Sequence, residues 1–304
     1  MGRQNSIRLF SYSGIEVRLH WWWFLAAVYE IQARSGRYSS INWNILEYLA
    51  LFLIVLLHEF GHALACRQVG GRANRIVLWP FGGVAYVDPP PRPGATLWSI
   101  AAGPLVNVAL FPVFLIAVTA AESAGWPSGS RDAYTLLVWV SKINLWLLIF
   151  NILPVYPLDG GQILRSLLWF ILGRARSLMA AAVLGLIGTA AFIGLAVWDQ
   201  NLWLGAIAVY MAMNCWGGFK HAQQLLRMAK MPRRNGYTCP TCNTAPPVGT
   251  YWRCSQCGQS FDTFETGAVC PSCKSQFPAT QCLDCGRQHA LPAWASSTLA
   301  FPQI

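Results

Sequence analysis

The sequence is poor in charged side chains, and above all in acidic ones. Charged residues make up 11% of the 304 residues, and Asp and Glu together number 12, whereas a soluble globular chain has about 25% charged residues. This deficit excludes an ordinary water-soluble domain as the fold of the whole chain. The hydrophobic fraction of 55% and the 15 tryptophans are typical of an α-helical polytopic membrane protein, in which Trp gathers at the interfaces.

The shortage of acidic residues leaves a formal net charge of +10. Nucleic-acid binding could explain such a charge, but basic loops on the cytoplasmic side of a membrane protein explain it more simply. The first 20 residues contain no apolar core followed by a small-residue cleavage site, so we expect no cleavable signal peptide there.

Apolar runs of membrane-spanning length divide the first 229 residues. We expect six spans, at about residues 21–33, 45–66, 95–121, 133–152, 177–198 and 201–219. Most arginines and lysines fall in segments that this topology places on one side, so the positive-inside rule puts both termini in the cytoplasm. The segment between the fourth and fifth spans, "LDGGQILRSLLWFILGRAR", is expected at the cytoplasmic interface.

Two segments at the cytoplasmic face have strand character rather than helical character. "SIRLFSYSGIEVRLH" partly alternates, with Ile15, Val17 and Leu19 between polar residues, and predicts one short strand that leads into the membrane. "RIVLWPFGGVAYV" is too short and too interrupted to cross a bilayer, and predicts two short strands around Gly82 and Gly83. We therefore expect a small β-element at this face.

The second expected span contains "HEFGH" within a long apolar run. His58 and His62 are four residues apart, so on a helix they share one face, and Glu59 stands beside the first of them. This H-E-x-x-H pattern is typical of zinc peptidases, in which the histidines bind the metal and the glutamate is the general base. Ionisable groups are costly inside a bilayer, which favours a functional site over packed polar residues.

A catalytic zinc needs a third protein ligand, which leaves a further position for water. The acidic candidates near the expected cytoplasmic face are Glu16, Asp88 and Asp159. We favour Asp159, because Pro154 and Pro157 interrupt the helix just before it. Irregular backbone at membrane depth is tolerated where it is buried in protein or lines a wet cavity.

The pair "HEFGH" and "NILPVYPLDGG" resembles the site-2 protease family of intramembrane zinc metalloproteases. The resemblance extends to "GIEVRLHW", "PFGGVA" and "AAGPLVN", and covers about residues 7–220. It implies His58, His62 and Asp159 as zinc ligands and Glu59 as general base. It also implies substrate contacts by Asn151 and by the loop at Gly82 and Gly83.

The family cuts transmembrane substrates, so the resemblance implies hydrolysis of peptide bonds within or near membrane spans, with a membrane protein as substrate and the lipid bilayer as environment. No PDZ insertion is visible, and the core is similar to the compact six-span branch of bacteria and archaea, which implies a prokaryotic plasma membrane. The alternative function is a non-catalytic membrane-anchored adaptor or regulator that acts through the C-terminal tail. A zinc transporter would need several metal sites across the spans. We find a single one in them, which argues against a transporter.

Cysteine is concentrated in the C-terminal tail, after a linker at residues 230–238. Four C-x-x-C pairs predict a double zinc ribbon over residues 239–288, followed by a tail at 289–304. The eight expected ligands of two structural zinc ions are Cys239, Cys242, Cys254, Cys257, Cys270, Cys273, Cys282 and Cys285. We favour sequential pairing of the four C-x-x-C pairs over an interleaved pairing of the first with the third. The few basic residues here argue against nucleic-acid binding. The roles that we consider for the ribbon are gating of the active site, docking of a substrate tail or a regulatory partner, and self-association.

Three polar residues in the expected spans are not explained by the metal site. Asn107 and Asn144 are expected to form hydrogen bonds between helices rather than to contact substrate. Lys142 falls in the middle of the fourth span. It either extends to the interface, pairs with another group, or indicates that the span boundary is wrong, and we favour the last two equally.

The two cysteines outside the tail, Cys66 and Cys215, are expected to be small buried hydrophobic residues.

Overall fold

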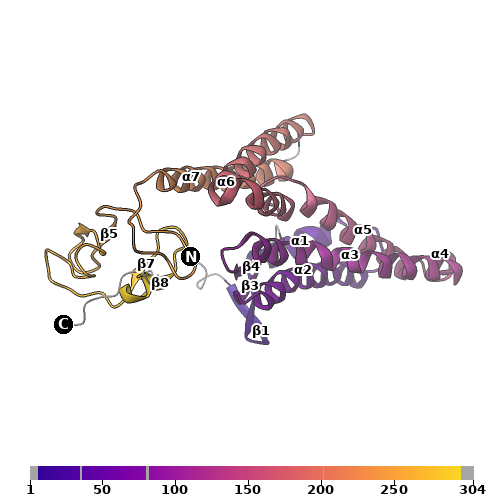
Figure 1. The fold of residues 1–304 in the computed structure, drawn as a ribbon. Helices are drawn as coiled ribbons and strands as arrows, with labels where there is room; N and C mark the ends of the chain where they lie inside the picture. The colour runs from indigo at the N-terminus through magenta and orange to yellow at the C-terminus, as the bar shows by residue number, and fades with distance from the viewer. Residues whose placement is uncertain (1–5, 35, 80–81, 201, 296–304) are drawn as a thin grey trace. The chain divides into compact units, whose positions relative to one another are not determined.

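The structure is a computed structural model, and it describes residues 6–34, 36–79, 82–200 and 202–295. The chain divides into two compact units, residues 1–219 and residues 220–304. The first unit is helical apart from one sheet. The second begins with the end of a long helix and continues as short hairpins, loops and a 3₁₀ helix (Figure 1).

A four-stranded sheet contains the predicted strands and one strand that was not predicted. It comprises β1 (Ser6–Tyr12), β2 (Ile15–His20), β3 (Arg72–Trp79) and β4 (Gly82–Asp88), in that order across the sheet. The β1–β2 and β3–β4 pairs are antiparallel, and β2 runs parallel to β3. The strand β4 therefore lies at one edge of the sheet, which becomes important at the candidate site.

Two helices connect β2 to β3 and place the first metal-ligand candidates over the sheet. These are α1 (Trp22–Ala33) and α2 (Ile41–Gln68). One hydrophobic core joins alternate residues of the sheet, such as Ile15 and Ile76, to Val55 and Ala63 of α2. The inward face of the sheet thus fixes the position of α2.

The helices α3 (Pro93–Ser123), α4 (Trp126–Gly129) and α5 (Arg131–Ile152) follow the sheet. The helix α3 packs closely on α2 at Gly61, where a Cβ atom would lie 2.6 Å from the carbonyl oxygen of Ala102. Small residues allow this kind of close helix approach in membranes.

The helix α6 (Asp159–Trp198) is interrupted at Gly173, whose φ of 76° and ψ of 170° are not helical. The interruption separates residues 159–172 from residues 174–198, which agrees with an interfacial segment followed by a span. The helix α7 (Leu202–Ala229) follows it.

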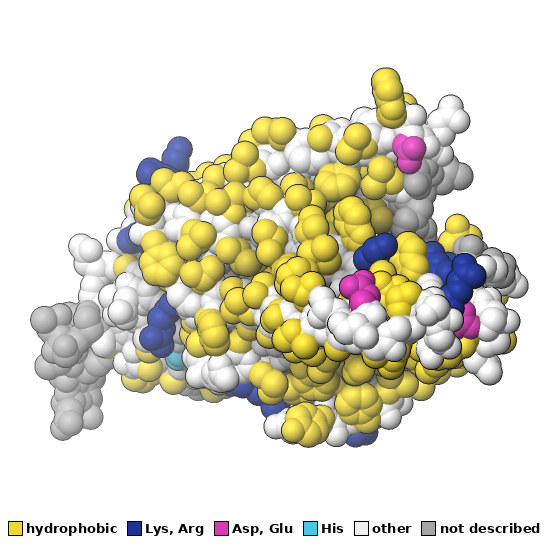
Figure 2. Space-filling view, turned by 90° about the vertical axis from the view of Figure 1, so that its right-hand side faces the viewer, with side chains coloured by type: hydrophobic (Ala, Val, Ile, Leu, Met, Phe, Trp, Pro, Cys, Tyr) yellow, Lys and Arg dark blue, Asp and Glu magenta, His cyan; other side chains and the backbone are white. Residues whose placement is uncertain are grey.

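Within the described residues, four helices are long and apolar enough to cross a membrane: α2, α3, α5 and α6. The helix α1 has 12 residues, about 18 Å of helix, which is shorter than a typical span. Six spans therefore remain a prediction. Hydrophobic side chains dominate the face seen in Figure 2, with few charged groups among them. Together with the apolar helices, this surface indicates an integral membrane protein.

The C-terminal unit contains two hairpins, β5 (Trp252–Arg253) with β6 (Ser260–Phe261) and β7 (Thr280–Gln281) with β8 (Gln288–His289). Both pairings that we weighed for the C-x-x-C pairs are wrong, because the arrangement is nested. The first pair meets the fourth, and the second meets the third. The two sets are Cys239, Cys242, Cys282 and Cys285, and Cys254, Cys257, Cys270 and Cys273.

The four C-x-x-C turns share one backbone pattern. In each, the amide of the fourth residue after the first cysteine donates to the carbonyl of that cysteine. That fourth residue has a positive φ in every turn: Asn243, Gly258, Lys274 and Gly286. Because the four turns are alike, their local sequence does not determine which two share a metal. The packing between the turns decides it.

That packing involves residues outside the predicted ribbon. Trp294, in the 3₁₀ helix Leu291–Trp294, is fully buried in a cluster with Trp252 and Phe264. Arg233 and Arg234, from the predicted linker, form ion pairs with Asp284 and Asp262. The ion pair of Arg233 with Asp284 joins the linker to the fourth turn, and the amide of Thr238 donates to the carbonyl of Trp294 at 2.7 Å. These two contacts bring the ends of the unit together, and so bring the first and fourth turns together.

Candidate active site

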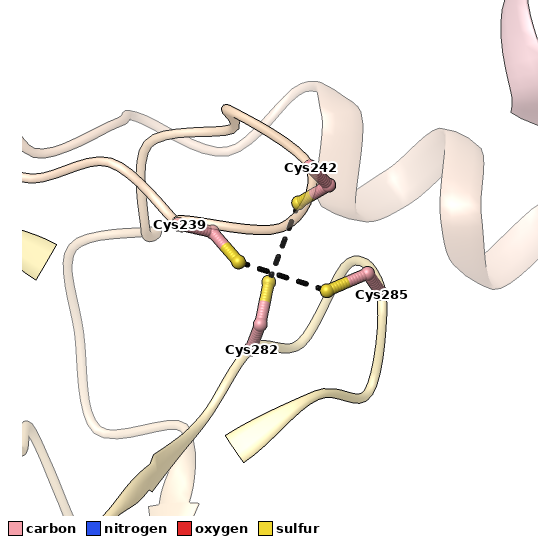
Figure 3. Close-up of side chains that lie close together, drawn as sticks. All are labelled: Cys239, Cys242, Cys282 and Cys285. Atoms are coloured by element: carbon pink, nitrogen blue, oxygen red, sulfur yellow. Dashed lines mark hydrogen bonds between the residues drawn. The ribbon is translucent and has the colours of Figure 1, made fainter. Parts of the chain in front are cut away.

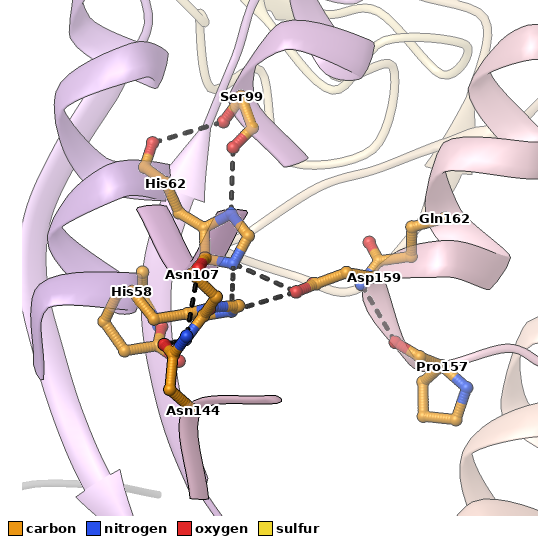
Figure 4. A network of polar contacts seen from close by, with 10 residues as sticks. His58, His62, Ser99, Asn107, Asn144, Pro157, Asp159 and Gln162 are labelled. Atoms are coloured by element: carbon orange, nitrogen blue, oxygen red, sulfur yellow. Dashed lines mark hydrogen bonds and ion pairs between the residues drawn. The ribbon is translucent and has the colours of Figure 1, made fainter. Parts of the chain in front are cut away.

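His58 and His62 lie on one face of α2, as the spacing predicts, and both are buried. Asp159 is the first residue of α6 and follows the loop of residues 153–158. Its Oδ2 lies 3.0 Å from Nε2 of His58 and 3.3 Å from Nε2 of His62. Figure 4 shows the three side chains converging from two helices. The structure thus brings the three predicted ligands together, and their donor atoms lie within 4.8 Å of one another.

The other ring nitrogens of both histidines are held by buried hydrogen-bond acceptors. Nδ1 of His58 lies 2.6 Å from Oδ1 of Asn107, and Nδ1 of His62 lies 2.9 Å from the carbonyl oxygen of Ser99. A carbonyl oxygen only accepts, so each Nδ1 carries the proton and each Nε2 presents a lone pair. Both rings are therefore oriented as metal ligands.

Asn107 is itself oriented by Asn144 on α5. The Nδ2 group of Asn107 donates to Oδ1 of Asn144 at 2.8 Å, and Nδ2 of Asn144 donates to the backbone carbonyl of Asn107 at 3.0 Å. Both residues are completely buried. The predicted hydrogen bonds between helices are therefore present. Asn107 takes part in two of them, one with Asn144 and one with His58.

The donor set fits a zinc ion. Two imidazole nitrogens and one carboxylate oxygen are the ligands of a known class of catalytic zinc site that leaves a position for water. Gly103 of α3 provides the space, because a Cβ atom there would lie 2.2 Å from Nε2 of His62 and 2.8 Å from Nε2 of His58. The residues present thus match both the chemistry and the space that the ion requires.

Glu59 is buried beside the three ligands, and its carboxylate is held by β4. The backbone amide of Ala85 donates to Oε2 of Glu59 at 2.7 Å. Gly83 makes this approach possible, since a Cβ atom there would lie 2.2 Å from Cγ of Glu59. The edge strand therefore positions the carboxylate next to the metal ligands without making it one of them.

A cavity of about 450 Å³ adjoins these groups. Its walls include His58, His62, Glu59 and Asp159, together with the three residues predicted to contact substrate: Gly82, Gly83 and Asn151. All the predicted site residues of the first unit therefore meet at one cavity. Asp88, the rejected ligand candidate, instead ends β4 opposite Arg72.

The loop before Asp159 is fixed by α6 and α7, which the sequence did not indicate. The Cys215 thiol donates to the carbonyl oxygen of Tyr156 at 2.7 Å. Cβ atoms at Gly185 and Gly188 would lie 2.9 Å from that carbonyl oxygen and 2.6 Å from a methyl group of Val155. Cys215 is buried as predicted, but it also anchors the chain three residues before Asp159. The only hint of this packing in the sequence was the pair Gly185 and Gly188, whose spacing places two small residues on one face of the helix.

The C-terminal unit contains the other two candidate metal sites. Figure 3 shows Cys239, Cys242, Cys282 and Cys285 pointing toward one centre, with Sγ–Sγ distances of 3.7 Å for two of the pairs. A hydrogen bond from the Cys282 thiol lowers the pKa of Cys242 to about 4. In the other set, a hydrogen bond from Ser275 lowers the pKa of Cys273 to about 6. In the first set, the hydrogen bond that lowers the pKa of Cys242 also raises, together with burial, the pKa of Cys282. The evidence for these two sites is therefore the convergence of four sulfur atoms in each set, which is the donor set of a structural zinc site.

A family model and a solved structure both relate this chain to the same family of peptidases. The chain matches peptidase family M50 over residues 47–125 and 126–195. It is similar to the solved site-2 protease from Methanocaldococcus jannaschii, with a TM-score of 0.53 and 30% identity, covering 70% of this chain and 95% of that chain. The chain belongs to the site-2 protease family of peptidase family M50.

Two curated relatives have lower coverage. A zinc metalloprotease of Methanocaldococcus jannaschii is 37% identical over 180 residues, which cover 59% of this chain and 50% of the relative. Rip3 of Mycobacterium tuberculosis is 31% identical over 183 residues, which cover 55% of this chain and 44% of the relative. The chain thus spans about half the length of the curated relatives it matches.

Proposed function

We propose that this chain is a zinc-dependent endopeptidase that hydrolyses peptide bonds within or near the transmembrane segments of membrane proteins. The observation that carries the proposal is the convergence of His58, His62 and Asp159 beside Glu59 at one cavity. Family membership supports the zinc ion and the hydrolytic chemistry. The apolar helices around the site support a substrate that lies in the bilayer.

Glu59 is proposed to act as the general base and then as the general acid. A zinc ion held by the three ligands supplies Lewis acidity, which polarises a carbonyl group and lowers the pKa of water. The Glu59 carboxylate accepts a proton from the attacking water and returns it to the leaving amide nitrogen. The Ala85 amide, 2.7 Å from Oε2, holds the carboxylate for this transfer.

The edge strand β4 is proposed to bind the substrate backbone. A helical peptide bond is protected by its own hydrogen bonds, so the segment to be cut must be extended first. An extended segment can add to an open sheet edge through backbone hydrogen bonds. β4 is the edge strand nearest the cavity, and Gly82 and Gly83 line that cavity. Asn151 also lines the cavity, and we propose that it binds a substrate backbone group.

The zinc ribbon is proposed to contain two structural zinc ions, each held by four cysteine thiolates. Four-cysteine sites leave no position for water, so these ions would stabilise the unit rather than catalyse a reaction. The distribution of arginine and lysine leads us to propose that the ribbon and both termini lie in the cytoplasm.

Comparison of membrane-protein fragments in cells that contain the wild-type protein or the Glu59→Gln variant tests this function. We expect single-span precursors to accumulate in the variant, and their cut sites in wild-type cells to lie inside apolar segments. The variant must be folded and loaded with three zinc ions per chain. If such a variant changes no fragment while the wild type is known to be expressed, the protease proposal fails, and the non-catalytic adaptor is the better interpretation.

A further inference from the structure

The position of Lys142 within the helix α5 bears on the three explanations considered for this residue. The helix α5 extends from Arg131 to Ile152 and is long and apolar enough to cross a membrane, so Lys142 does not mark an end of this helix. Lys142 stands eleven residues after the first residue of α5 and ten before the last. At about 1.5 Å per residue, its Cα atom is roughly 15 Å from either end of the helix. The lysine is therefore central in an apolar helix.

The side chain of Lys142 belongs to an exposed face of α5. Leu145, Trp146 and Ile149 follow at the spacing of one helix face, with exposed fractions of 36%, 67% and 46%, and Lys142 is also exposed. We call these four residues the Lys142 face. Asn144, on the other side of α5, is completely buried.

The charge of Lys142 is not balanced by the part of the chain that the structure describes. Its ammonium group forms no ion pair there, and its nitrogen lies 4.8 Å from the centre of the Trp139 ring. Arg37 contacts the same ring at 3.8 Å, so this ring is shared between two cations. A charged side chain at mid-membrane is costly, and such residues usually pair with another group.

We propose that the Lys142 face binds a transmembrane helix of a partner protein that carries Asp or Glu at mid-membrane depth. The partner's carboxylate would pair with Lys142, and Leu145, Trp146 and Ile149 would pack against its apolar side chains. Lipid headgroups lie too far away along the helix to serve as the counter-ion. The charge thus specifies the chemistry of the partner.

The partner is an accessory protein rather than the segment to be cut. Leu147 and Asn151 of α5 line the catalytic cavity, and Asn151 is nine residues from Lys142. Nine residues at 100° each place the two on opposite sides of α5. A helix on the Lys142 face would therefore be separated from the cavity by α5 itself, and could remain bound during catalysis.

Binding of designed single-span helices tests this inference. The probe is a leucine-rich helix with one Asp at the bilayer centre, and the control helices have Leu at that position or the Asp near one end. Each is labelled, mixed with the full-length Glu59→Gln protein in lipid nanodiscs, and measured by fluorescence energy transfer. Use of this variant separates binding from cleavage.

We expect the central Asp to tighten binding roughly threefold to fifteenfold over central Leu, the range of polar interactions between membrane helices. Lys142→Met should remove this preference, and Lys142→Arg should retain it. Lys142→Glu should instead prefer a probe with central Lys. If Lys142→Met does not fold, Lys142→Gln tests the same loss of charge.

Four results would overturn the inference. The first is an Asp preference that survives in Lys142→Met, and the second is equal binding of the Asp and Leu helices. The third is cleavage of the Asp helix by the wild-type protein that depends on Lys142, because the occupant would then be a substrate. Self-association of the protein that is lost in Lys142→Met would likewise replace the accessory partner with a second copy of the chain.

Discussion

The hydrogen bond between Asn107 and His58 should support zinc affinity as well as folding, and a matched variant separates the two effects. Asn107→Ala removes the acceptor that lies 2.6 Å from Nδ1 of His58. Loss of a group that orients a metal ligand typically lowers metal affinity about 10- to 100-fold, which is about 1.4 to 2.7 kcal/mol. The same change leaves the buried Oδ1 of Asn144 without its donor, at a cost of about 1–3 kcal/mol in stability.

Asn144→Ala is the matched control. It also leaves a buried amide group without a partner, but it retains the bond between Asn107 and His58. We therefore expect similar losses of thermal stability in the two variants, with zinc affinity reduced strongly only in Asn107→Ala.

The assay is a chelator titration of the purified protein with zinc released measured per chain. The wild type should release three zinc ions in two phases, because we propose that the eight cysteines hold two of them. We expect the phase of one ion to shift to about 10- to 100-fold lower chelator concentration in Asn107→Ala. An unchanged phase in Asn107→Ala, or an equal shift in Asn144→Ala, would refute the orienting role of Asn107.

Three further predictions concern space, anchoring and packing. Gly103→Ala should abolish binding of one zinc ion of three, because its Cβ would lie 2.2 Å from Nε2 of His62; three zinc ions in a folded variant would contradict this. Cys215→Val removes the thiol donor to Tyr156 and should weaken the same zinc ion, whereas Cys215→Ser should restore it; equal zinc affinities in the two variants would count against the anchoring role. Trp294→Ala empties the centre of the ribbon core and should destabilise that unit by about 3–5 kcal/mol, measured by denaturation of the zinc-loaded protein; a loss below about 1 kcal/mol would be incompatible with that packing.

The candidate active site was predictable because its parts are encoded by local patterns. His58, Glu59 and His62 are specified by helix spacing within an apolar run. Asp159 is distinguished by the prolines and glycines around it, and Gly82 and Gly83 by a turn between two alternating segments. Each pattern involves a few consecutive residues, and the family resemblance relates the patterns to one another.

The nested zinc ribbon was not predictable in this way. The four turns have the same local sequence form and the same backbone hydrogen bonds, so their pairing depends on contacts between distant residues. Trp294 and the two linker ion pairs, Arg233 with Asp284 and Arg234 with Asp262, provide such contacts. None of them forms a periodic pattern in the sequence. The first strand, β1, was missed for a different reason. It pairs locally with β2 across the turn at Ser13 and Gly14, but its side chains are largely exposed, so the sequence shows no apolar face there.

The central claim is tested most directly by purified protein in lipid vesicles with a labelled single-span substrate. Mass spectrometry of the products identifies the bond that is cut. We predict that the wild-type protein cuts inside the apolar segment, that chelation prevents the cut, and that Glu59→Gln with three bound zinc ions leaves the substrate intact. Cleavage by Glu59→Gln at the wild-type rate, or a cut that falls only in the soluble flanks, would contradict the account.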